Sequence, residues 1–331
     1  MMSTLASAWP LIYFGKLPCR GDFIRSSTGQ ALIARLDPWF SQTLARLAHD
    51  VRWRLLWETC PPVDFAVLGS RSQVGLLGQI RASQDASGRL FPFSMTAQFP
   101  TTQPMSWLGE GSLQLGPAWE TLDALGQSLV RADSYEAVQA LMGRTQALEV
   151  PPADAACRAQ WQALVEEQGL LDLELGMSSD GRQVDLRRCV IALGILLEPL
   201  RQEGPQALAK GLRLPMPMEE PLRSQALAFW LRLLASQVQH QGVELALMLP
   251  RRAPQWLMLS FHGASTRALC AALHPDMAQE DMISLDEPLW VDDCLGEWRE
   301  LMRWSTELEH PGLSLREVLR GFETVFGNDG R

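Results

Sequence analysis

Residues 11–25 have the sequence LIYFGKLPCRGDFIR, which changes character twice along its length. An apolar run leads into a segment of glycine, proline and charged residues, and an aromatic and an aliphatic residue follow. This pattern predicts a strand that runs into a constrained loop. Gly15 and Gly21 can take positive φ at little cost, whereas Pro18 fixes φ and has no N–H group to donate. We therefore expect this loop to have few conformations open to it.

The loop carries three charged candidate site residues, which are Lys16, Arg20 and Asp22. Arg20 and Asp22 flank Gly21, so their side chains either pair across the turn or reach outward together. Two interpretations follow. In the first, the charges form an ion pair within the fold, where such pairs often contribute little to stability. In the second, the charges form part of a binding surface.

A second charged motif, SQDASGRLFP, lies at residues 83–92. Gly88 suits the turn of a hairpin, and Asp85 and Arg89 are spaced so that an ion pair between them would hold it together. The alternative is that Ser83, Asp85 and Arg89 form part of the same binding surface as the first loop. The sequence leaves both interpretations open.

The strings FGKLPxRGDF at residues 14–23 and SxDxxGRxFP at residues 83–92 together resemble the TagF family, also called ImpM. Members of this family are accessory proteins of the bacterial type VI secretion system. The resemblance covers about residues 9–130, and the segment FHGAS at residues 261–265 resembles the extension of longer members. It implies a cytoplasmic, non-enzymatic protein that represses secretion after translation. It also implies that the protein acts by binding the forkhead-associated scaffold protein of the apparatus.

The amino-acid composition argues against several classes of function. The chain has 331 residues, of which 47% are hydrophobic and 20% charged, so we expect a compact protein of two domains or one large one. A net charge of −9 argues against nucleic acid as the main partner. The six cysteines are far apart and form no Cys-x-x-Cys motif, which predicts neither a disulfide framework nor a zinc site.

The apolar stretches predict a soluble protein. The longest of them, residues 189–197, is well short of the roughly 20 residues that cross a bilayer, so we expect no transmembrane segment. The N-terminus lacks a cationic leader followed by an apolar core, so we expect no signal peptide.

Periodicity predicts the elements of the first half. Helices are expected at residues 27–36 and, after a new start at Asp37 and Pro38, through the tryptophans at residues 53 and 57. Alternating residues at 63–69, 74–80 and 91–97 predict an antiparallel meander. Pro92 places the start of the last strand at an edge or beyond its pairing. Two helices, at residues 119–130 and 134–142, close this half.

The second half has a similar order of elements. Helices are expected at residues 188–201 and 222–238, strands at 245–249 and 256–261, and helices again at 266–273, 292–306 and 315–326. Ser314 and Glu317 have the spacing of a capping box. Residues 143–185 are the least patterned. They include Pro151-Pro152 and the turn at residues 178–181, which makes them the predicted domain boundary.

The predicted fold class is therefore α/β, with two packed domains at residues 1–142 and 186–331. Each domain is expected to be a small, mainly antiparallel sheet flanked by helices, in a layered α/β sandwich, with residues 143–185 as the linker.

Catalytic motifs are sparse. The sequence contains no phosphate-binding P-loop, no Gly-x-Gly-x-x-Gly and no Gly-x-Ser-x-Gly, and its histidines stand alone, so no cofactor or metal is expected. His262 and Ser265, at a predicted strand-to-helix turn, suggest a hydrolase as one alternative. The competing interpretation is that Ser265 caps the helix that follows. A structural component of the secretion assembly is the other alternative to a regulator.

Overall fold

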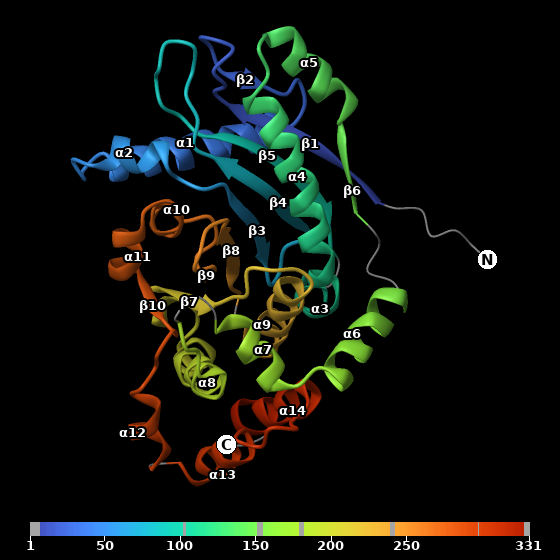
Figure 1. The fold of residues 1–331 in the computed structure, drawn as a ribbon, viewed down its shortest axis with the longest axis vertical. Coiled ribbons are helices and arrows are strands. Elements are labelled where there is room, and N and C mark those ends of the chain that lie inside the picture. Colours follow the sequence, from blue (N-terminus) through green and yellow to red (C-terminus); the bar gives the residue numbers. More distant parts are fainter. Residues whose placement is uncertain are drawn as a thin grey trace.

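The protein is built on one open sheet with helices on both faces (Figure 1). The computed structural model describes residues 7–101, 104–150, 155–178, 182–238, 242–296 and 298–327. In this part of the chain the sheet has ten strands in the order β10-β7-β9-β8-β3-β4-β5-β1-β2, and β6 pairs with β1. All pairs are antiparallel except β10 with β7. The predicted α/β class with a mainly antiparallel sheet is confirmed.

The strands are β1 (Ser7–Gly15), β2 (Ile24–Arg25), β3 (Val63–Gly69), β4 (Val74–Arg81), β5 (Phe93–Pro100), β6 (Ala147–Val150), β7 (Gly211–Pro215), β8 (Glu244–Pro250), β9 (Trp256–Ser260) and β10 (Met282–Ser284). The meander of β3, β4 and β5 is as predicted. Strand β5 begins directly after Pro92, whose missing N–H group therefore removes no hydrogen bond from the ladder.

The strands of the two sequence halves belong to a single sheet. Strand β3 pairs along its whole length with β8, from Val63 opposite Pro250 to Gly69 opposite Glu244. The sequence pattern predicts a sheet in each half, and the structure joins these two sets of strands through the β3–β8 ladder. No local signal indicates such a pairing between segments so far apart in the sequence.

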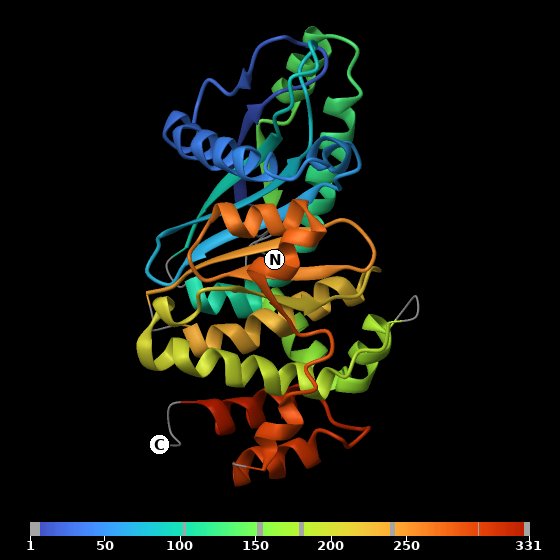
Figure 2. The same cartoon turned by 90° about the vertical axis from the view of Figure 1, so that its left-hand side faces the viewer.

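The helices are α1 (Gln30–Leu47), α2 (Trp53–Glu58), α3 (Pro104–Glu110), α4 (Leu115–Val130), α5 (Tyr135–Arg144), α6 (Ala155–Glu167), α7 (Leu170–Met177), α8 (Leu186–Glu203), α9 (Leu222–Val238), α10 (Thr266–Leu273), α11 (Pro275–Asp281), α12 (Val291–Leu295), α13 (Arg299–Glu307) and α14 (Leu315–Phe326). In Figure 2 the layers are seen edge-on, with α1 and α10 on one side of the sheet and α8 and α9 on the other.

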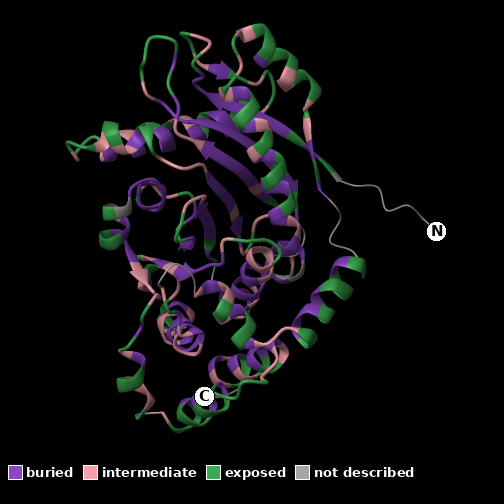
Figure 3. Cartoon of the chain, in the orientation of Figure 1, coloured by how far each residue is buried: buried purple, intermediate pink, exposed green. Residues whose placement is uncertain are grey.

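Each face of the sheet has its own hydrophobic core. Strand β1 shows why, because Ile12 and Phe14 pack with α1 and α10 in one core, whereas Leu11 and Tyr13 pack with α4, α8 and α9 in the other. Successive side chains of a strand point to opposite faces, so a strand buried on both faces is apolar at every position. Figure 3 shows this burial along the central strands.

Helix α1 is continuous, so the predicted new start at Asp37 is wrong. Pro38 lies inside the helix and has no N–H group to donate to the preceding turn. Leu36 and Trp39 on either side of it are both buried against the sheet, as are residues nearer each end of the helix. Packing of this single apolar stripe outweighs the local cost of the proline.

The stretch predicted as a linker contains regular structure. Strand β6 and helices α6 and α7 lie within residues 143–185. Pro151-Pro152 and residues 179–181 of the predicted turn lie outside the described residues. The division of the chain into domains at 142 and 186 stays a prediction.

Two predicted helix starts are confirmed by their hydrogen bonds. Ser265 Oγ accepts from Ala268 N at 3.1 Å, and Ser314 forms a full capping box with Glu317. The helix predicted at residues 292–306 is instead two helices, α12 and α13. Within the described residues, no helix combines the length and the hydrophobicity that a membrane span requires.

Candidate interaction site

The first charged loop begins where β1 runs over the start of β5. Gly15 has φ +137° and pairs with Phe93 of β5 and Ile24 of β2. A Cβ atom at Gly15 would lie 2.0 Å from the carbonyl oxygen of Pro92, so only glycine allows this approach. The loop then returns to the sheet as β2.

The second charged motif forms the predicted hairpin. Asp85 N donates to Arg89 O at 3.1 Å, and Gly88 N donates to Asp85 O at 2.9 Å. Gly88 has φ +79°, which fits its predicted place in the turn. The predicted ion pair is also present, because Arg89 Nε lies 2.7 Å from Asp85 Oδ2.

Asp85 is the centre of the site, and its residue exposure is 2%. Its Oδ2 accepts from Lys16 Nζ at 2.9 Å as well as from Arg89 Nε. Its Oδ1 accepts from Ser87 N at 2.9 Å, Ser87 Oγ at 2.7 Å and Arg89 N at 3.0 Å. Burial opposes ionisation of this carboxyl group. The hydrogen bonds from Lys16, Ser87 and Arg89 outweigh burial and hold the pKa of Asp85 well below its usual value.

The two motifs form one unit, which we call the loop pair (residues 16–22 and 83–89). Besides the Lys16–Asp85 pair, Ala86 N donates to Arg20 O at 3.1 Å. Arg89 Nη2 donates to Gly21 O at 2.6 Å. The sequence predicts each loop separately, whereas the structure makes a single hydrogen-bonded surface of both. No spacing rule links Lys16 to Asp85, because they are 69 residues apart.

The six predicted site residues divide into two groups by burial. Lys16, Ser83 and Asp85 are buried, and the ion pair of Lys16 with Asp85 holds the loop pair together. Asp22 is exposed, the Arg89 side chain is 64% exposed, and Arg20 is half-buried.

Arg20 and Asp22 do not form the pair that the sequence suggests. No ion pair joins them in the described part of the chain, and the Arg20 guanidinium instead stacks on Tyr135 of α5, 4.0 Å from the ring centroid. This contact ties Arg20 to α5, and Asp22 is exposed as a separate charge. Sequence reasoning missed Tyr135, because nothing in the α5 sequence distinguishes it from a residue of an amphipathic helix.

A cluster of aromatic side chains packs against the loop pair. Phe14 stacks with Phe23 at 5.7 Å between centroids, and Phe91 meets both rings edge-on at 5.8 and 4.8 Å. Lys16 Nζ lies 5.1 Å from the Phe23 ring centroid. The Phe residues at the ends of the two motifs therefore fix the charged loops on a packed base.

A pocket of about 310 Å³ lies beside the loop pair. Pro18 lines it from the first loop, and Leu90 lines it from the hairpin. Trp57 of α2 forms another wall, where its Nε1 donates to Ser83 O at 3.0 Å. The surface beside the charged groups therefore has a hollow, which is lined by apolar residues and also by Glu58 and Gln84.

The other predicted pair, His262 and Ser265, is not brought together. His262 Nε2 lies 2.9 Å from the carbonyl oxygen of Leu208. Ser265 Oγ caps α10 and lies 3.5 Å from Ser260 Oγ. The helix-capping interpretation of Ser265 is confirmed.

Comparisons with known proteins agree with the two motifs. Residues 12–145 match a family model described as the TagF N-terminal domain, type VI secretion system-associated. Both strings of the loop pair lie inside this match. The chain is also similar to a crystal structure of PA0076 from Pseudomonas aeruginosa PAO1, with 20% identity and a TM-score of 0.37. That match covers 46% of this chain and 76% of the other. No curated protein matches the chain.

Proposed function

We propose that this chain represses type VI secretion after translation, because residues 12–145 match the model of the TagF N-terminal domain, which is described as type VI secretion system-associated. The proposed partner is the forkhead-associated scaffold protein of the secretion apparatus, and the proposed contact surface is the loop pair. The proposal places both proteins in the cytoplasm.

The observation that carries the proposal is the hydrogen-bonded centre at Asp85. Five hydrogen bonds converge on one buried carboxylate and join two loops that present Asp22 and Arg89 to solvent. A surface that is already ordered loses less conformational entropy when it binds a partner. The fixed loops therefore suit recognition of another macromolecule.

The exposed charges and the neighbouring pocket have complementary roles in this proposal. Asp22 and Arg89 have opposite charge, and such groups at the rim of an interface set partner choice and association rate. The pocket next to Pro18 and Leu90 has room for one apolar side chain of the partner, which would supply a buried anchor.

We also propose that the protein acts without a catalytic step. The His262 ring contacts the carbonyl oxygen of Leu208, whereas Ser265 Oγ accepts from Ala268 N and so has a sufficient role as a helix cap. A repressor that works by contact needs no nucleophile or general base.

A binding experiment tests the contact surface. The purified full chain is titrated with the purified scaffold protein, and the dissociation constant is measured for the wild type, Asp22→Arg and Asp293→Arg. Asp293 is an exposed acid of α12, so its reversal changes net charge equally without touching the loop pair. We expect Asp22→Arg to weaken binding by about tenfold or more, because a reversed charge at an interface opposes its partner group. Asp293→Arg should bind as the wild type does.

Equal affinities for the wild type and Asp22→Arg, with an Arg20→Ala variant also unchanged, would remove the loop pair from the interface. Circular dichroism of each variant shows whether the fold is retained. In cells, deletion of the protein should raise type VI secretion. A Ser265→Ala variant should restore repression if no catalysis is involved.

A further inference from the structure

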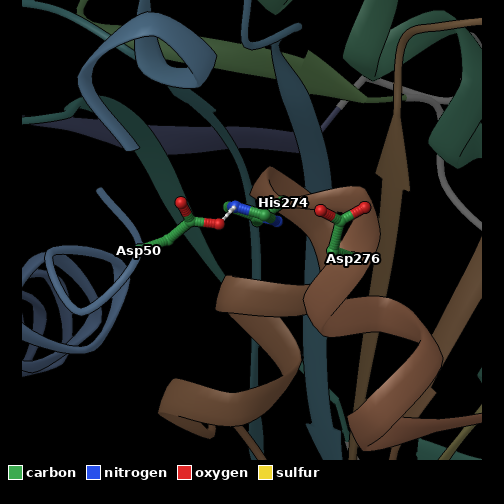
Figure 4. Close-up of side chains that lie close together, drawn as sticks. All are labelled: Asp50, His274 and Asp276. Carbon is green, nitrogen blue, oxygen red and sulfur yellow. Dashed lines mark hydrogen bonds and ion pairs between the residues drawn. The ribbon is translucent and has the colours of Figure 1, made fainter. Parts of the chain in front are cut away.

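Three potential metal ligands converge where α1 ends. Asp50 lies in the turn after α1, His274 joins α10 to α11, and Asp276 lies in the first turn of α11. One ligand atom from each residue lies within 4.8 Å of the other two. Figure 4 shows His274 between the two carboxylates, with its Nε2 on Asp50 Oδ2 at 3.1 Å. No other group of three such residues in the described ranges meets this distance.

The donor set is that of a divalent transition metal. One imidazole nitrogen and two carboxylate oxygens are ligand types of Zn²⁺, and three protein ligands leave a coordination position open. His274 is only 2% exposed, so its ring is fixed in the position where Nε2 faces Asp50.

The charges around the cluster also favour a cation. Arg52 Nη2 lies 2.9 Å from Asp50 Oδ2 and 2.6 Å from Asp276 Oδ2. One guanidinium thus faces two carboxylates, which leaves an excess of negative charge. The Arg52 side chain is 57% exposed and is free to turn outward into water.

We propose that Asp50, His274 and Asp276 bind a divalent transition metal of the Zn²⁺ type, and that Arg52 occupies the cation position in its absence. The bound ion would tie the end of α1 to the α10–α11 turn. These segments are 224 residues apart in the sequence and lie on the same face of the sheet. Metal binding would then strengthen the contact between the first and last thirds of the chain.

Calorimetric titration of the metal-stripped full chain with Zn²⁺ tests this site, with the visible absorption of bound Co²⁺ as a second readout. We expect one saturable site per chain. Asp276→Asn should abolish it or weaken it by about tenfold or more, because a carboxylate ligand is lost. Glu280→Gln is the matched control, since it removes an exposed acid one turn further along α11. His49→Gln removes an exposed histidine next to Asp50, and both controls should bind as the wild type does.

Arg52→Ala separates this proposal from a purely structural salt bridge. Removal of the competing side chain should tighten Zn²⁺ binding by up to about fivefold, which corresponds to the loss of one partly exposed ion pair. A structural role alone would lower the unfolding temperature of this variant without creating metal affinity. The absence of saturable binding in both the wild type and Arg52→Ala would overturn the proposal. Affinity that is unchanged in Asp276→Asn would overturn it as well.

Discussion

Two glycines of the loop pair, Gly21 and Gly88, and the adjacent Gly15 differ in what an added methyl group would meet. The destabilisation caused by alanine at each position should differ accordingly. Gly21 has open space and a backbone that any residue adopts. Gly88 also has open space, but its φ is +79°. Gly15 has both φ +137° and the Pro92 carbonyl oxygen at 2.0 Å from the Cβ position. The expected order of destabilisation is therefore Gly15→Ala, then Gly88→Ala, then Gly21→Ala.

The magnitudes follow from these local differences. Gly21→Ala should be neutral or stabilising by up to about 1 kcal/mol, because alanine restricts only the unfolded chain. Gly88→Ala should cost about 1 kcal/mol, since left-handed backbone with a Cβ costs roughly 1–2 kcal/mol and the unfolded-state gain offsets part of it. Gly15→Ala combines strain of about 1–3 kcal/mol with an overlap that costs a similar amount, so we expect about 4 kcal/mol.

Urea unfolding followed by tryptophan fluorescence measures the series, with the shift in midpoint converted to free energy by a common slope. Binding to the scaffold protein is measured in parallel for the variants that fold. If Gly15→Ala unfolds at the same urea concentration as Gly21→Ala, the close approach of β1 to Pro92 does not hold. The account of the loop pair as a fixed surface would then fail with it.

Two further predictions concern the ionised centre and the helix cap. The folded-state pKa of Asp85 is lowered, so the stability that its ionised form adds is fully present above its unfolded pKa of about 3.9 and is lost as pH falls from there toward the folded-state pKa. The difference in urea midpoint between the wild type and Asp85→Asn should therefore begin to narrow between pH 4 and pH 3, and a constant difference from pH 7 to pH 3 would contradict this. Ser265→Ala should lower the free energy of unfolding by about 1 kcal/mol through loss of the α10 cap, and a change below a few tenths of a kcal/mol would refute the capping role.

The sequence predicts the local parts of the site well. Gly88 in the turn, the Asp85–Arg89 pair and the Ser265 cap all depend on residues at most four apart in the chain. Over such distances the backbone geometry of a turn or a helix fixes which groups meet. The strands of the β3–β5 meander are predicted for the same reason.

The features of the fold and of the site that the sequence does not predict depend on contacts between segments far apart in the chain. Lys16 reaches Asp85 only because β1 lies beside β5, and Arg20 meets Tyr135 only because α5 lies beside the loop. The interruption predicted at Pro38 is wrong because burial on both sides of it decides the course of α1. Local preferences are weak compared with tertiary packing, so such features cannot be predicted from one sequence.

The ladder between β3 and β8 has a consequence for work with fragments. A truncated protein that ends before residue 244 would leave the main-chain N–H and C=O groups of β3 without their neighbour. Exposed sheet edges recruit strands from other molecules, which leads to aggregation or strand exchange. A truncated protein that contains β3 but lacks β8 therefore needs one of two changes to stay monomeric. Either a separate peptide pairs with β3 in place of β8, or charged residues are introduced along residues 63–69.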